Sequence, residues 1–84
     1  MGLEATCQAR MDGKASQGTC RLEEADLVFR GDAFRFKVLL EDLRKVDARG
    51  GALHLEWAEG GAVLDLGDQA ERWAKKTGRL KRQG

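Results

Sequence analysis

The sequence predicts a mainly β domain closed by one C-terminal α-helix. Up to residue 66, runs of alternating apolar and polar residues are separated by four glycine-containing pairs, each able to form a two-residue hairpin loop. After Gly67 the apolar residues recur every three or four positions, which is the period of an amphipathic helix. A chain of 84 residues has room for one thin core, so we expect residues 1–84 to form a single domain.

The four loops define the expected strand pairing, because counting outward from a two-residue loop gives each residue an opposite residue on the next strand. These registers place most apolar side chains on one face of each hairpin. The expected pairs are Ala5–Cys20, Cys7–Gly18 and Ala9–Ser16 around Asp12-Gly13; Phe29–Phe34 and Leu27–Phe36 around Gly31-Asp32; Ala48–Leu53, Val46–Leu55 and Asp47–His54 around Gly50-Gly51; and Trp57–Leu64, Leu55–Leu66 and Glu56–Asp65 around Gly60-Gly61.

The same pattern gives the strand positions. Residues 39–45 break the alternation, and we expect them to lead the chain from one antiparallel sheet onto a second, which gives a two-sheet β-barrel or sandwich. The expected strands cover about residues 4–11, 14–23, 25–30, 33–38, 43–49, 52–58 and 62–66.

The C-terminal helix is expected from about Gln69 to Leu80. Asp68 is a favourable N-cap residue, and Glu71 follows three residues later, close to a capping box. Gly78 is expected to weaken or end the helix. We expect the inward face of this helix to fill the gap at one corner between the sheets. The residues of that face are Ala70, Trp73, Ala74, Thr77 and Leu80.

Two stretches carry a family resemblance: residues 22–29, LEEADLVF, and residues 34–46, FRFKVLLEDLRKV. They combine an apolar strand, a hairpin and an aliphatic-polar-polar-aliphatic corner. With Trp73 on the closing helix, they resemble the pleckstrin-homology-like (PH-like) superfamily, in particular GRAM-type and bacterial PH-like modules. The resemblance covers nearly the whole chain in element order and implies a single PH-like domain over residues 1–84. Domains of this fold bind lipids, peptides or proteins.

Composition argues against several functional classes. The formal net charge of +1 gives no general reason to expect a nucleic acid partner. No apolar stretch approaches the roughly 20 residues of a membrane-spanning helix, and Glu4 and Arg10 interrupt any signal-peptide core. We therefore expect a cytoplasmic protein without a transmembrane segment. Met1-Gly2 followed by Thr6 fits the loose N-myristoylation pattern, which many unmodified proteins also match.

The chemically reactive residues form no recognised catalytic or metal-binding pattern. Cys7 and Cys20 are expected to be buried free thiols; a disulfide between them is conceivable but unexpected in a reducing cytoplasm. His54 is expected on a solvated face among scattered carboxylates, without the spacing of a metal site. Ser16 is expected to face inward without a histidine partner. We therefore expect no catalysis, no metal and no cofactor.

The first hairpin is the region in which phosphoinositide-binding PH domains concentrate basic residues. Here it offers only three, and its turn carries Asp12, so it would make a weak anion site. These candidate ligand or anion residues are Arg10, Lys14 and Arg21.

Charge is strongly polarised along the chain. Residues 1–70 carry nine basic and thirteen acidic residues, and residues 71–84 carry six basic residues and one acidic residue, so the net charges are −4 and +5. Cations near a helix C-terminus complement the helix dipole and solvate the polar face. They also suit docking of an acidic partner, an anionic lipid surface or nucleic acid. The candidate docking residues are Arg72, Lys75, Lys76 and Arg79.

We expect a non-enzymatic PH-like interaction or scaffold module that binds a protein partner, or a second copy of itself, through a sheet edge or the basic helix. The alternative is peripheral binding of anionic lipid or another phosphate ligand, through the basic helix or through Arg10, Lys14 and Arg21. The sequence leaves open the identity of the ligand or partner and the oligomeric state. It also leaves open whether the natural chain continues into a second domain beyond residues 80–84.

Overall fold

Seven strands, two short 3-10 turns and one α-helix make up the part of the chain that the computed structural model describes, which is residues 2–83 with the side chains of residues 2–81. Met1 of the acylation pattern and Gly84 of the C-terminal tail lie outside the described residues, as do the side chains of Arg82 and Gln83. In chain order the elements are β1 (Leu3–Met11), β2 (Lys14–Leu22), β3 (Asp26–Gly31), β4 (Arg35–Leu39), η1 (Leu40–Asp42), β5 (Leu43–Arg49), β6 (Ala52–Trp57), β7 (Gly60–Asp65), η2 (Gly67–Gln69) and α1 (Ala70–Gln83).

The first and third hairpins have the predicted register. Cys7 lies opposite Gly18 in the first, and the predicted pairs of β5 and β6 are present in the third. Both loops have positive φ at two residues, 53° and 78° at Asp12-Gly13 and 56° and 79° at Gly50-Gly51. Such loops match the twist of the strands and accept only a few residue types, mainly glycine, asparagine and aspartate. The predicted register is therefore confirmed for the two hairpins whose loops accept few residue types.

The second hairpin has a longer loop than predicted. Phe29 lies opposite Phe36 instead of Phe34, so the predicted ladder is wrong by two residues. The loop instead bonds to β2, where the Ser16 hydroxyl accepts hydrogen bonds from the backbone amides of Ala33 and Phe34. A shift of two residues leaves the same side chains facing inward, so alternation alone does not detect it.

The fourth hairpin turns at Ala58-Glu59 rather than at Gly60-Gly61. Trp57 lies opposite Gly60 instead of Leu64, so the predicted ladder is wrong by four residues. Gly61 belongs to the strand: a Cβ atom there would lie 2.6 Å from the carbonyl oxygen of Leu55. Glycine is required at this position by a close backbone approach, and the sequence pattern does not distinguish that requirement from a turn.

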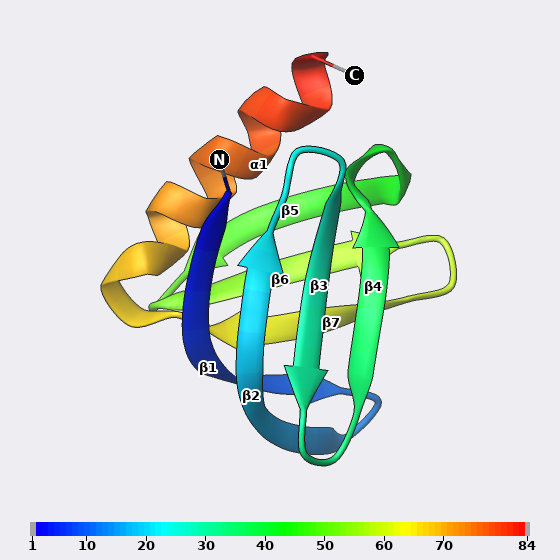
Figure 1. Cartoon of the computed structure of the whole chain (residues 1–84), viewed down its shortest axis with the longest axis vertical. Helices are drawn as coiled ribbons and strands as arrows, with labels where there is room; N and C mark the ends of the chain where they lie inside the picture. The colour runs from blue at the N-terminus through cyan, green and yellow to red at the C-terminus, as the bar shows by residue number, and fades with distance from the viewer. Residues whose placement is uncertain (1, 84) are drawn as a thin grey trace.

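The strands form one hydrogen-bonded sheet in the order β4-β3-β2-β1-β7-β6-β5. β1 pairs with β2 along its whole length, but with β7 only at residues 8–10. At this junction the sheet folds over into two layers, with β1 to β4 in front of β5 to β7 and running in a different direction (Figure 1). The predicted mainly β class with a C-terminal helix is confirmed. The two predicted sheets are present as layers of one continuous sheet, with β4 and β5 at its edges.

The core lies between the two layers and under α1. A row of aromatic rings crosses it: Phe29 stacks on Phe36 with ring centroids 5.7 Å apart, and Phe36 lies 5.6 Å from Trp57. The strands of both layers and the helix contribute to this core. Its buried side chains are Cys7, Ala9, Cys20, Leu22, Leu27, Phe29, Val38, Leu40, Leu43, Leu53, Leu55, Leu64, Leu66, Ala70 and Trp73.

α1 begins and ends later than predicted. Asp68 lies inside the 3-10 turn η2, and the helix starts at Ala70. Gly78 lies inside the helix, so of the two expectations for it, weakening or ending the helix, the second is wrong. The last turn is held by a tertiary contact, in which Lys81 Nζ donates a hydrogen bond of 2.6 Å to the carbonyl oxygen of Leu43. A hydrogen bond from a charged donor offsets the roughly 1 kcal/mol that glycine costs within a helix.

The predicted inward face of the helix is confirmed. Ala70, Trp73 and Thr77 are buried, and Ala74 and Leu80 are partly buried against the core. The opposite face of the 14-residue helix is charged. Among the described residues, no helix is both long enough and apolar enough to cross a membrane.

Two adjacent leucines at the corner between β4 and β5 provide a test of this packing. Leu40 is 2% exposed and Leu39 is 41% exposed. We expect Leu40→Ala to lower the free energy of unfolding by about 2–5 kcal/mol, because it removes buried methyl groups and leaves a cavity. The matched change Leu39→Ala is expected to cost about 1 kcal/mol at most. Urea denaturation followed by circular dichroism measures both, and equal losses would contradict the arrangement of this corner.

Candidate functional site

The outer face of α1 carries four basic side chains. Ala70, Trp73 and Thr77 recur at the helical period and are buried, so the positions between them point away from the core. Three of the four basic residues are exposed and one is partly buried. They are the docking residues predicted from the sequence, Arg72, Lys75, Lys76 and Arg79.

These four cations line a groove of about 540 Å³, which we call the basic groove. Leu3, at the start of β1, also lines it, and Figure 1 shows that end of β1 beside the helix. Asp68 and Glu71 lie at the end of the groove nearest the helix N-terminus. The groove is therefore acidic at one end and basic along the rest of the helix.

No cation of the basic groove forms an ion pair with a described side chain, whereas four cations of the sheet do. Some sheet cations are also unpaired, such as Arg30 and Arg35, which lie opposite each other on β3 and β4. The basic groove differs because it brings four unpaired cations to one hollow. The sheet pairs are Arg10–Asp65 (3.1 Å), Arg21–Glu23 (3.6 Å), Arg21–Glu4 (3.9 Å), Lys37–Asp26 (3.5 Å) and Arg49–Asp47 (2.6 Å).

The half of β1 that begins at the basic groove has one unpaired side. Residues 3–7 pair with β2, but the ladder with β7 covers only residues 8–10. Within the described chain, no strand pairs with the other side of residues 3–7. Unpaired backbone N–H and C=O groups at a strand edge can bond to another extended chain. The start of β1 therefore places such an edge beside the cations of the helix.

The structure does not bring together the three candidate anion residues of the first hairpin. Arg10 and Lys14 lie at the β1–β2 turn, whereas Arg21 lies near the other end of β2, opposite Glu4. At about 3.3 Å per residue, the two ends are roughly 20 Å apart along the strand. Arg10 and Arg21 are each paired with a carboxylate as well. These residues therefore do not form one phosphate-binding cluster.

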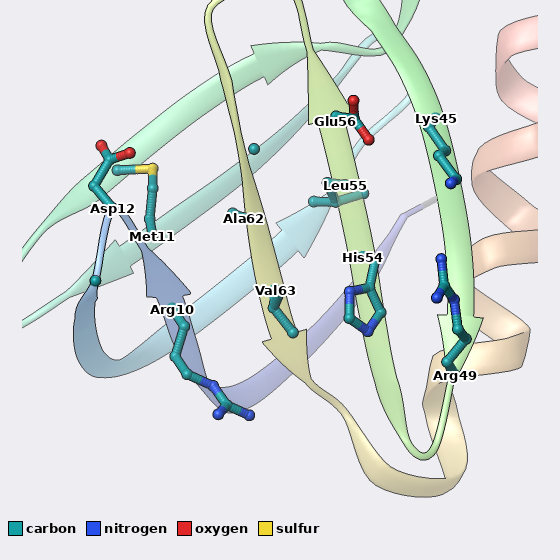
Figure 2. Close-up of a pocket in the computed structure, with 12 residues that line it drawn as sticks. Arg10, Met11, Asp12, Lys45, Arg49, His54, Leu55, Glu56, Ala62 and Val63 are labelled. Carbon is teal, nitrogen blue, oxygen red and sulfur yellow. The ribbon is translucent and has the colours of Figure 1, made fainter.

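A second hollow, of about 380 Å³, lies on the outer face of β5, β6 and β7 beside the first hairpin. Figure 2 shows Lys45 and Arg49 on β5, His54 on β6 and Arg10 on β1 along this hollow. Sequence reasoning missed the grouping because it depends on the ladder between β1 and β7, two strands that no turn connects. The predicted register of β5 and β6 places Lys45, Arg49 and His54 on one face, so it is Arg10 that the sequence does not bring to this group.

Carboxylates balance much of the positive charge in this second hollow. Arg10 pairs with Asp65, and Arg49 Nε donates a hydrogen bond of 2.6 Å to Asp47. That hydrogen bond lowers the pKa of the Asp47 carboxyl, and nearby positive charge adds to the effect. His54 lies opposite Asp47, as predicted. No three His, Cys, Asp or Glu side chains of the described residues lie close enough together to hold a metal ion.

Ser16 has a structural role. Its hydroxyl is buried, donates a hydrogen bond of 3.1 Å to Asp32 Oδ1, and accepts one of 2.9 Å from the backbone amide of Ala33. Asp32 Oδ1 also accepts a bond from the amide of Gln17. The hydroxyl is thus used to fix the β3–β4 loop on β2, and its inward orientation agrees with the prediction.

Comparison with known proteins shows the fold but not the function. No protein-family model matches the chain, and no curated protein matches it. Among solved structures, the chain is similar to the C-terminal domain of an unknown protein from Leishmania infantum, with a TM-score of 0.70 and 12% sequence identity. The match covers 98% of this chain and 83% of that one. At this identity the similarity establishes a shared arrangement of strands and helix.

Ser16→Ala tests the structural role of the hydroxyl. We expect the free energy of unfolding to fall by about 1–2 kcal/mol, because the substitution removes the hydrogen bonds that the buried hydroxyl forms with the Ala33 amide and the Asp32 carboxylate. Thr6→Val removes an exposed hydroxyl from β1 and is expected to change stability by no more than about 0.5 kcal/mol. Urea denaturation of the two variants checks the prediction, which fails if Ser16→Ala is as mild as the control.

Proposed function

We propose that this chain is a cytoplasmic, non-enzymatic PH-like interaction module that binds an extended acidic segment of a partner protein in the basic groove. The observation that carries the proposal is the set of four cations, none with an ion pair among the described side chains, along one groove. The PH-like assignment is supported by the sequence resemblance and by the element order, seven antiparallel strands followed by a helix that packs on them.

The helix dipole accounts for only part of this charge. Positive charge is favourable near a helix C-terminus and unfavourable near the N-terminus. Arg79 lies in the C-terminal half of α1, but Arg72 is the third residue of the helix. The dipole therefore gives no reason for the first cation of the groove, whereas binding of a long acidic ligand gives a reason for all four.

The unpaired side of β1 supports an extended conformation for the bound segment. Residues 3–7 offer backbone groups on the side that β7 leaves uncovered. A segment that adds to a strand edge gains affinity from main-chain hydrogen bonds, and its side chains provide specificity. Acidic side chains of such a segment would meet the cations of α1 across the groove.

The shape and charge of the groove favour a protein segment over a lipid surface. A groove between a helix and a strand accommodates a narrow chain, whereas a bilayer presents a broad surface. A narrow acidic chain can contact the cations of α1 away from Asp68 and Glu71, whereas a broad anionic bilayer would also meet the acidic side chains that give residues 1–70 a net charge of −4. Anionic lipid binding, the alternative from the sequence, becomes an outcome of the same test.

Fluorescence anisotropy with a labelled glutamate-rich peptide tests the proposal, with a lysine-rich peptide of equal length as the negative probe. We expect the full chain to bind only the acidic peptide. The double variant Lys75→Glu, Lys76→Glu is expected to weaken binding at least about tenfold, because it replaces attraction with repulsion at the centre of the groove. The matched control is Arg30→Glu, Arg35→Glu, which reverses two unpaired charges on β3 and β4 and is expected to bind as the wild type does.

Three results would overturn this proposal. One is equal weakening by the two double variants, which would indicate attraction to overall charge. Another is failure to bind the peptide together with salt-sensitive binding to anionic but not neutral vesicles, which would favour the lipid alternative. The third is elution of the wild type as a stable dimer in size exclusion, with the Lys75→Glu, Lys76→Glu variant eluting as a monomer. A second copy of the chain would then be the occupant of the groove.

A further inference from the structure

The register of the first hairpin brings the two cysteines into contact. Cys7 lies opposite Gly18 and Cys20 lies opposite Ala5, so the thiols are diagonal neighbours on the inward face. Gly18 has no side chain, which leaves the Cys7 thiol free to turn toward Cys20. The two sulfur atoms are 3.1 Å apart.

The hydrogen bonds around this pair make the two thiols chemically different. Cys20 Sγ donates a hydrogen bond of 3.3 Å to the carbonyl oxygen of Ala5 and also contacts Cys7 Sγ. Contact with the Cys20 sulfur lowers the pKa of Cys7, whereas contact with Cys7 and burial raise the pKa of Cys20. Cys7 is therefore the thiol that ionises first, and the thiolate is the nucleophilic form.

Access to the pair is restricted but not closed. Cys20 is completely buried, and Cys7 is 4% exposed. Cys7 ends the part of β1 that lacks a partner on one side, and a strand held by a single ladder opens locally more easily than one held by two. Small oxidants therefore have a route to Cys7 before they reach Cys20.

We propose that Cys7 and Cys20 form a reversible intramolecular disulfide when the protein meets a hydroperoxide, and that a dithiol reductant restores the two thiols. The sulfur atoms need to approach by only about 1 Å to reach the bond length of roughly 2.05 Å. The chain contains no other cysteine to compete as the partner.

The reaction proceeds in two balanced steps when the hydroperoxide is hydrogen peroxide. The Cys7 thiolate attacks one peroxide oxygen, the O–O bond breaks, and hydroxide leaves and takes up the proton that Cys7 released, so that one water and a sulfenic acid form. Cys20 sulfur then attacks Cys7 sulfur, the S–O bond breaks, and the hydroxide that leaves takes the Cys20 proton as a second water. Two thiols are oxidised to one disulfide while one peroxide is reduced to two waters.

The test is a titration of the folded, reduced full chain with hydrogen peroxide. We expect mass spectrometry to show the loss of two hydrogen atoms per chain without dimer formation, and thiol titration in denaturant to fall from two thiols to none. Dithiothreitol should restore both. Three results would overturn the proposal. The chain could keep both thiols, its cysteines could gain oxygen instead of losing two hydrogen atoms, or it could form only intermolecular disulfides.

Single-cysteine variants test the order of the steps. Cys20→Ala retains Cys7 and removes its hydrogen-bond partner, and Cys7→Ala retains the more buried thiol. We expect neither variant to lose two hydrogen atoms. We expect the remaining thiol of Cys7→Ala to react with hydrogen peroxide at least about tenfold more slowly than the wild-type pair. Circular dichroism confirms that each variant is folded, and the wild-type titration decides the proposal even if a variant is not. Equal reaction rates of Cys7→Ala and the wild type would contradict attack by Cys7.

Discussion

The short ladder between β1 and β7 is the constraint on which the rest of the structure depends. Only residues 8–10 of β1 pair with β7, and beyond them the strands diverge. The sheet folds over at this point, where β1 and β2 curve from one layer into the other (Figure 1), and the divergence of β1 from β7 opens a corner between the layers. α1 lies against β5 and β6 at this corner (Figure 1). Its outer face then lines the basic groove together with Leu3.

Burial of Trp73 holds the helix in that corner, on a scale of about 3–5 kcal/mol for truncation of a buried tryptophan to alanine. Two polar atoms of the inward face, Trp73 Nε1 and Thr77 Oγ1, are buried without a hydrogen-bond partner among the described residues. Each such atom typically costs about 1–3 kcal/mol, which offsets part of the stability gained by burying this face. The bond from Lys81 to the Leu43 carbonyl secures the last turn. Because these inward contacts attach the helix, the cations on its outer face are not needed for that purpose.

The hairpin loops show why some of the fold could be predicted and some could not. Asp12-Gly13 and Gly50-Gly51 adopt positive φ, a demand that few residue types meet, so the sequence reveals both the loop and the register. Gly61 is required by a close backbone approach inside a strand, not by a turn. The sequence pattern does not separate these two roles of glycine, so the predicted pairing of β6 with β7 was wrong. The cations of α1 could be grouped from the helical period alone. Leu3 could not be added to them, because its position depends on a ladder between strands distant in sequence.

The unpaired half of β1 links the two proposals physically. The segment of residues 3–7 is held by β2 on one side only, so its order depends on inward contacts. Two of these contacts involve the thiols, the bond from Cys20 to the Ala5 carbonyl and the contact between Cys7 and Cys20. A covalent bond between the sulfurs would remove the Cys20 proton that bonds to the Ala5 carbonyl, but it would replace that contact with a cross-link that restricts local opening of the strand whose first residue lines the basic groove. Oxidation would then pre-order the edge that an extended ligand must use, and this lowers the ordering entropy that binding requires.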